Sequence, residues 1–96
     1  MKIKVKSWFA NKVLNEKKVR LSNASLYAIL KETDKAVYGM MADSANFVFA
    51  WFPKSCLEEG GRYNTYEAGH QLQFADGSTR EMDVQTAINF WKADRD

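Results

Sequence analysis

The stretch from Leu26 to Pro53, LYAILKETDKAVYGMMADSANFVFAWFP, decides the fold of this chain. It holds three apolar runs separated by short polar segments, and the runs are Leu26–Leu30, Ala36–Met41 and Phe47–Phe52. Short apolar runs bounded by polar turn residues are typical of β-strands, and short connections between them favour antiparallel hairpins. The stretch therefore predicts a three-stranded antiparallel meander.

The third run is apolar on both faces of the strand that it predicts. Side chains alternate between the two faces of a strand, and in residues 47–52 both alternating sets are apolar. A strand of this kind is usually buried on both sides, so we expect it to be the central strand of the sheet. Pro53 has no N–H group to donate and should end the strand.

The N-terminal segment Lys2–Ser7 alternates strictly between polar and apolar residues. This pattern predicts a first strand that buries Ile3 and Val5 and exposes Lys2, Lys4 and Lys6. Residues 11–25 are polar, and their apolar side chains follow no clear period. We predict a loop there, with room for a short helix or strand.

Turn residues organise the second half of the chain. Residues 54–61 predict a turn with a flexible break at Gly60–Gly61. Residues 71–74 and 79–84 predict a second hairpin, with its turn at Asp76–Gly77. An alternative interpretation of the same residues is a helix that begins just after the turn.

The competing helix rests on Ser78 and Glu81, which match the spacing of a capping box, and we prefer the hairpin. A clearer helix follows Asp83, a good N-cap residue, because apolar side chains recur at helical spacing through residues 84–93. Together these elements predict a single α+β domain over residues 1–96. It is either a small curled antiparallel sheet or a partial SH3- or OB-like barrel, of about five strands with one C-terminal helix.

Composition and charge favour a folded protein with a basic N-terminal part. Apolar residues make up 46% and aromatic residues 14% of the chain. The net charge is +2, but residues 1–35 carry nine Lys/Arg against three Asp/Glu, and residues 36–96 carry five against nine. The basic part suits phosphate groups or acidic partners, or it simply keeps edge strands from pairing. Because so small a chain buries a modest core, a homodimer would add stability.

The residue types needed for catalysis or metal binding are too scattered to predict a site. His70 is the single histidine, and Cys56, the single cysteine, is more typical of a small buried residue than of a nucleophile. No metal-ligand spacing is present, and Gly60–Gly61 lacks the phosphate-loop pattern. We expect no enzyme activity, no metal and no cofactor.

Cysteine usage and hydropathy predict the compartment. A single cysteine forms no internal disulfide, which favours a reducing environment. The chain opens without a secretory leader, and no apolar run reaches the roughly 18 residues needed to span a bilayer. We therefore expect a cytoplasmic protein with no membrane partner.

Aromatic and basic residues supply the candidate binding surface. The chain holds 3 Trp, 4 Tyr and 6 Phe, so we expect some rings to be exposed, and we expect Tyr27 and Tyr38 to be cross-strand neighbours. Exposed rings beside lysines are typical of single-strand nucleic-acid binding, but they also suit a protein interface or ordinary core packing. The candidate binding residues are Lys2, Lys4, Lys6, Tyr27, Tyr38, Trp51, Lys54 and Ser55.

A short motif resembles a group of small phage proteins. The segment Ala50–Leu57, AWFPKSCL, follows Thr33–Val37 in a pattern similar to the strand-end Trp-x-Pro-Lys-Ser motif of small uncharacterised proteins of bacteriophages and mobile elements. The resemblance covers residues 26–57, with Phe52 where an aliphatic residue is usual. It implies an accessory protein in a bacterial host and carries over no catalytic residue. The partner that it implies is nucleic acid or a nucleoprotein complex, or else a host defence protein, such as a CRISPR effector, that the chain would inhibit.

Overall fold

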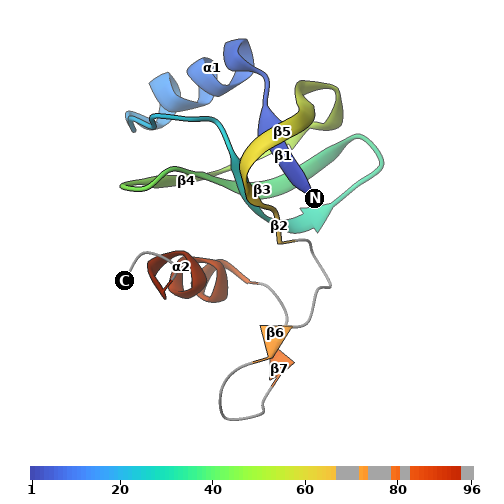
Figure 1. The fold of residues 1–96 in the computed structure, drawn as a ribbon. Coiled ribbons are helices and arrows are strands. Elements are labelled where there is room, and N and C mark those ends of the chain that lie inside the picture. The colour runs from blue at the N-terminus through green and yellow to red at the C-terminus, as the bar shows by residue number, and fades with distance from the viewer. Residues whose placement is uncertain (67–71, 74–78, 81–82, 94–96) are drawn as a thin grey trace.

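Two main antiparallel sheets and two helices form an α+β fold (Figure 1). The computed structural model describes residues 1–66, 72–73, 79–80 and 83–93. Along the chain the elements are β1 (Lys2–Val5), α1 (Ser7–Lys17), β2 (Leu26–Glu32), β3 (Ala36–Ala42), β4 (Phe47–Pro53), the 3-10 turn η1 (Lys54–Cys56), β5 (Leu57–Asn64), β6 (Leu72–Gln73), β7 (Thr79–Arg80) and α2 (Val84–Ala93).

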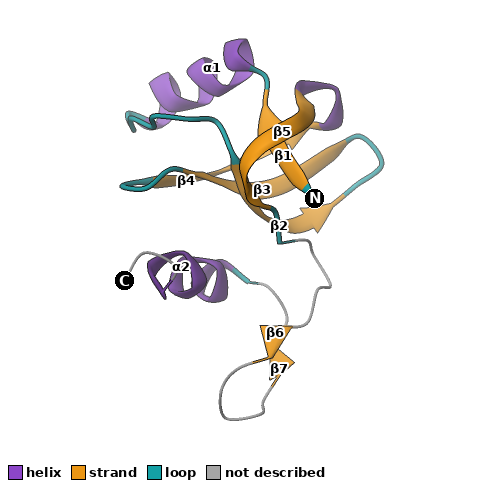
Figure 2. Ribbon diagram, in the orientation of Figure 1, coloured by secondary structure: helices purple, strands orange, loops and turns teal. Residues whose placement is uncertain are grey.

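Strands β2, β3 and β4 form the antiparallel meander that the sequence predicts, and Pro53 ends β4. The strand order β2-β3-β4 puts β3 in the centre and β4 at the edge, so the prediction that the third apolar run is the central strand is wrong. In a meander the middle strand of the chain is flanked by both neighbours, whatever its composition. The strand β4 is apolar on both faces because α1 and α2 pack on opposite sides of the sheet (Figure 2).

Strands β1 and β5 pair antiparallel to form the second sheet. The predicted turn over residues 54–61 is correct only for η1, because the chain then continues directly as β5. Gly60 and Gly61 lie inside this strand and do not form a flexible break. Gly60 has a φ of 111°, and a Cβ on Gly61 would lie 2.9 Å from the backbone nitrogen of Ile3. The two glycines therefore allow a bulged pairing in which the backbones of β1 and β5 approach closely.

Backbone hydrogen bonds join the two sheets into a curled arrangement. The N–H of Val5 donates to the carbonyl of Ala24 over 2.9 Å, just before β2 begins. Beyond β5, the N–H of Ile29 donates to the carbonyl of Tyr66 over 2.6 Å, and the N–H of Tyr66 donates to the carbonyl of Tyr27 over 3.0 Å. The described strands thus form the predicted curled arrangement, and they do not close into a barrel.

Helix α1 occupies the first part of the segment 11–25, where the sequence predicts a loop with room for a short helix or strand, and it begins before that segment at Ser7. It adds a second helix to the expected one. Its buried residues Ala10 and Val13 form a narrow stripe that belongs to the same core cluster as Phe52. A stripe this narrow gives a weak helical period, so the helix is stabilised mainly by tertiary packing. The helix ends at Lys18, whose φ of 57° lies in the left-handed region.

The C-terminal helix lies where the sequence predicts it, at Val84–Ala93. Asp83 caps the helix, because its Oδ1 accepts the N–H of Thr86 over 2.7 Å. Strands β6 and β7 pair antiparallel, which favours the predicted hairpin over the competing helix. The predicted turn at Asp76–Gly77 and the capping residue Ser78 lie outside the described residues.

The core has two layers, one on each face of the meander. The first lies between the meander, α1 and the second sheet, and its largest buried residues are Phe52, Leu26 and Met41. The second lies between the meander and α2, and it includes Tyr27, Met40 and Trp91. The sheet β2-β3-β4 is thus the middle layer. Its side chains can form a binding surface only where neither core covers the sheet.

Candidate functional site

A row of one lysine and two aromatic side chains crosses the meander. Lys31 in β2 lies opposite Tyr38 in β3, and Tyr38 lies opposite Trp51 in β4. Directly opposed residues of an antiparallel pair point to the same face of a sheet. The rings of Tyr38 and Trp51 are 5.4 Å apart, and Trp51 is 48% exposed. We call Lys31, Tyr38 and Trp51 the aromatic row.

Ring contacts continue from the aromatic row toward α2 on the same face. Phe49 stacks on Tyr38, with the ring centroids 6.2 Å apart and the planes 20° from parallel. Phe47 lies 5.8 Å from Phe49, and Trp91 of α2 lies 5.0 Å from Phe47. Exposure rises from 8% at Trp91 to 48% at Trp51. Helix α2 therefore covers one end of this series of rings, and the aromatic row is its open end.

A groove of about 310 Å³ lies between α1 and the strands β3 and β4. Lys12 stands at this groove with its Nζ 5.9 Å from the centroid of the Phe9 ring. The two lysines of the groove outnumber its one glutamate, so the charge beside the row is positive on balance. The lining residues are Phe9, Lys12, Val13, Glu16 and Lys17 from α1, and Tyr38, Phe49, Ala50 and Trp51 from the sheet.

More lysines lie where the strands of the meander end, next to the aromatic row. The carbonyl of Lys35, in the β2–β3 turn, accepts the N–H of Lys54 over 2.8 Å. The Nζ of Lys54 is 2.7 Å from Glu32 Oε2, and both side chains are exposed. Exposed ion pairs contribute little to stability, so Lys54 can exchange this carboxylate for an incoming anion at small cost. Ser55 is exposed beside it in η1.

The structure brings together only part of the predicted binding set. Tyr38 and Trp51 are direct neighbours, and Lys54 and Ser55 lie at the same end of the sheet. The expected pairing of Tyr27 with Tyr38 is wrong, because the β2–β3 hairpin pairs Lys31 with Tyr38 and places Tyr27 beside the far end of β3. Tyr27 is only 3% exposed and belongs to the core that faces α2.

The three predicted lysines of the N-terminal strand lie on the other sheet. Lys2 and Lys4 belong to β1, Lys6 follows it, and all three are exposed. Lys4 Nζ is 3.5 Å from Glu58 Oε1 of β5. Lys2 lines a different pocket, described below. These lysines are therefore not part of the aromatic row.

Sequence reasoning missed three residues beside the row, Phe49, Lys12 and Lys17. A signal for Phe49 was present, since it alternates with Trp51 on one face of β4. The two lysines carried no such signal, because nothing in the sequence places α1 next to β4. Their positions depend on a helix that is recognisable only once it is packed.

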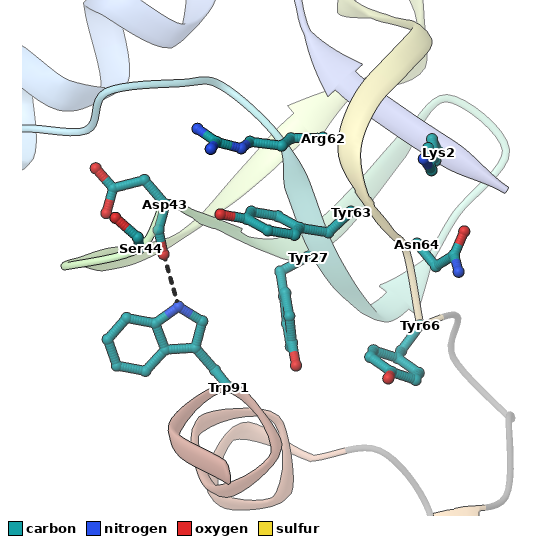
Figure 3. Close-up of a pocket in the computed structure, with 9 residues that line it drawn as sticks. All are labelled: Lys2, Tyr27, Asp43, Ser44, Arg62, Tyr63, Asn64, Tyr66 and Trp91. Carbon is teal, nitrogen blue, oxygen red and sulfur yellow. Dashed lines mark hydrogen bonds between the residues drawn. The ribbon is translucent and has the colours of Figure 1, made fainter. Parts of the chain in front are cut away.

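A second pocket, of about 590 Å³, opens between β1, the end of β5 and α2 (Figure 3). Trp91 forms part of its wall, and the indole Nε1–H donates to the Asp43 carbonyl over 2.9 Å. The lining residues are Lys2, Tyr27, Asp43, Ser44, Arg62, Tyr63, Asn64, Tyr66 and Trp91.

The Asp43 carboxylate organises the loop beside this pocket. It accepts the N–H groups of Ser22, Ala45 and Asn46 over 2.6, 2.6 and 2.7 Å. Burial on its own would raise the pKa of Asp43, but these hydrogen bonds together hold that pKa below its ordinary value. The side chain is therefore a charged structural anchor for the β3–β4 loop.

Other kinds of site receive no support from the described residues. Among them, no group of three or more His, Cys, Asp or Glu side chains is placed to hold a metal ion. None of the described helices is long and apolar enough to cross a membrane. Cys56 is buried, and His70 lies outside the described part of the chain.

The chain matches no protein-family model, and no curated protein or solved structure gives a significant match.

Proposed function

We propose that this protein binds single-stranded nucleic acid through the aromatic row. The observation that carries the proposal is the placement of Lys31 in line with the neighbouring rings of Tyr38 and Trp51. Bases stack on such rings with about 1–3 kcal/mol per base, while adjacent lysines follow the phosphates. Duplex bases are already stacked on one another, so partly exposed rings favour an unpaired strand.

The surroundings of the row support this proposal. Lys35 and Lys54 lie at the end of the same sheet, and Lys12 and Lys17 line the groove beside Trp51. Lysines at the end of the sheet and in the groove thus lie near the rings, where they could meet the phosphates of a strand that stacks on them.

We infer a non-enzymatic role, on nucleic acid or a nucleoprotein complex of a phage or mobile element, in the cytoplasm of a bacterial host. The support is the resemblance of Trp51–Ser55 to the strand-end motif of such proteins. Pro53 ends β4, and the chain turns there into η1. The motif thereby presents Lys54 and Ser55 next to Trp51, at the open end of the ring series.

Binding of fluorescent oligonucleotides, followed by anisotropy, tests the proposal. We expect a single strand to bind more tightly than the matching duplex, and Trp51→Ala and Phe49→Ala each to weaken binding about tenfold, since each removes a stacking ring. Trp8→Ala is the matched control, because Trp8 is 64% exposed on α1 and does not line the groove. Absence of binding at low salt, or an equal loss in the Trp8 variant, would contradict the proposal.

A second candidate function is inhibition of a host defence protein through a protein interface. The observation that favours it is that β4 is an edge strand whose sequence, FVFAWFP, contains no charged residue. Edge strands are usually protected by charge, and an unprotected edge suits the addition of a partner strand. DNA cleavage by a purified CRISPR effector nuclease tests this function: inhibition that Trp51→Lys relieves would support it, and full cleavage at excess protein would contradict it.

A further inference from the structure

The pocket between β1, the end of β5 and α2 combines aromatic walls with two cationic lining residues (Figure 3). Its volume of about 590 Å³ is in the range of small-molecule sites, which are about 300–1,000 Å³. Four of its nine lining residues are aromatic, namely Tyr27, Tyr63, Tyr66 and Trp91. The pocket is separate from the aromatic row, with which it shares no lining residue.

The aromatic walls are held in place by the core. Tyr27 is 3% exposed, and its ring centroid lies 5.5 Å from that of Tyr66 and 6.4 Å from that of Tyr63. The Trp91 ring is held in place by the hydrogen bond from its indole N–H to the Asp43 carbonyl. Rings held in this way offer a preformed surface for a planar group, which avoids much of the ordering cost of binding.

Two cations, Lys2 and Arg62, line the pocket. Both are exposed, and no carboxylate of the described residues lies within 4.0 Å of either charge. The guanidinium carbon of Arg62 lies 6.0 Å from the Tyr63 ring centroid, so the charge stands beside an aromatic wall. Asn64, directly opposite Lys2 in the β1–β5 pairing, and Ser44 add neutral hydrogen-bonding groups.

Among the described residues that line the pocket, Asp43 is the one acidic residue, and its carboxylate is already engaged. Three backbone N–H groups donate to it, and in Figure 3 it points away from the Trp91 ring. The part of Asp43 that faces Trp91 is its carbonyl. The Asp43 carboxylate is therefore directed to the loop backbone and not to the interior of the pocket.

We propose that this pocket binds a nucleoside 5′-phosphate. The base would pack against the aromatic walls, and the phosphate would meet Arg62, since a guanidinium donates to phosphate in a bidentate manner. The nucleotide can be free, or it can be the 5′-terminal nucleotide of a strand. Binding of the 5′-terminal nucleotide of a strand rests on the proposed function, because the rest of that strand would lie on the aromatic row.

Calorimetric titration with adenosine monophosphate, adenosine and inorganic phosphate tests the pocket directly. We expect the nucleotide to bind about tenfold or more tightly than either part, because only the nucleotide uses both the rings and Arg62. Arg62→Gln and Tyr63→Leu should each weaken nucleotide binding about tenfold. Lys18→Gln, which removes an exposed charge outside the pocket, should leave it unchanged. Nucleotide binding no tighter than that of its parts, or insensitive to both pocket variants, would overturn the proposal.

Oligonucleotides with a 5′-phosphate or a 5′-hydroxyl distinguish the two sources. If strand ends enter the pocket, the phosphorylated strand binds more tightly and Arg62→Gln removes the difference. If the pocket takes free nucleotide alone, the two strands bind equally while the mononucleotide still binds. Failure of the proposed function is a separate result, in which neither strand binds but the mononucleotide does. Equal binding of both strands without mononucleotide binding overturns the pocket proposal and leaves the aromatic row.

Discussion

Asp43 shows at the scale of one residue how a short polar segment fixes the loop between β3 and β4. Its carboxylate accepts three backbone N–H groups, and its carbonyl accepts the indole of Trp91. Without this carboxylate, the backbone N–H groups of Ser22, Ala45 and Asn46 would lose their hydrogen-bond acceptor when the loop packs. Asp43 therefore anchors the segment before β2 and the β3–β4 loop through its side chain, and it anchors α2 through its backbone carbonyl.

Asp43→Asn should destabilise the protein near neutral pH by about 1–3 kcal/mol, because an amide offers one acceptor oxygen in place of two charged ones. The folded-state pKa lies below the ordinary value of 3.8, so the stabilisation is present above that pH and is lost as the pH falls through the folded pKa. Urea unfolding at about pH 7 and about pH 3 should show the difference between variant and parent shrinking at the lower pH. Asp34→Asn, in the exposed β2–β3 turn, is the control. A difference that is the same at both pH values would contradict this role.

Tyr27 and Tyr38 show why residue identity alone did not locate the site. Both lie in predicted strands of the meander, and both strands exist as predicted. The β2–β3 hairpin pairs Glu32 with Val37, so Lys31 and not Tyr27 stands opposite Tyr38. The alternation of the sequence did not predict this register, because β2 is apolar at nearly every position before Lys31.

At the scale of elements, strong periodicity and turn chemistry predicted the meander and α2, and weak periodicity failed for α1. The apolar residues of α2 cover a broad face, and Asp83 marks its start. Helix α1 buries only Ala10 and Val13, and no side chain caps its N-terminus. The groove beside the aromatic row depends on α1, which is why that part of the candidate site was not predictable.

Trp91→Phe should loosen α2 while preserving most of the ring packing against Phe47. The change removes the N–H donor to the Asp43 carbonyl and with it a buried hydrogen bond, at a cost of about 0.5–1.5 kcal/mol. We expect a lower urea midpoint and faster hydrogen exchange of the α2 amides than of the β3 amides. Trp8→Phe, at an exposed position, is the control and should change stability by less than about 0.5 kcal/mol. Equal acceleration of exchange in α2 and β3 would mean that α2 does not open on its own.

At the scale of the whole molecule, the basic half of the sequence does not form one basic surface. Residues 1–35 carry nine Lys/Arg, but the fold distributes them among β1, α1 and the end of the meander. Lys4 faces Glu58, and Lys2 stands at the second pocket. The charge asymmetry of the sequence therefore overstates the number of cations beside the aromatic row.

The salt dependence of strand binding measures that number. If a bound strand meets Lys31, Lys35 and Lys54, three of its phosphates are neutralised. A plot of the logarithm of the affinity against the logarithm of the salt concentration should then have a slope of about −2, because each phosphate contributes about −0.7. Lys31→Gln should make the slope less steep by about 0.7, while Lys18→Gln should leave it unchanged. A slope near zero would exclude phosphate contacts, and a slope of about −2 that Lys31→Gln does not alter would place them away from the aromatic row. Because the predicted Lys2, Lys4 and Lys6 lie on the second sheet, their triple Gln variant should also retain the parent slope if the strand stays on the meander.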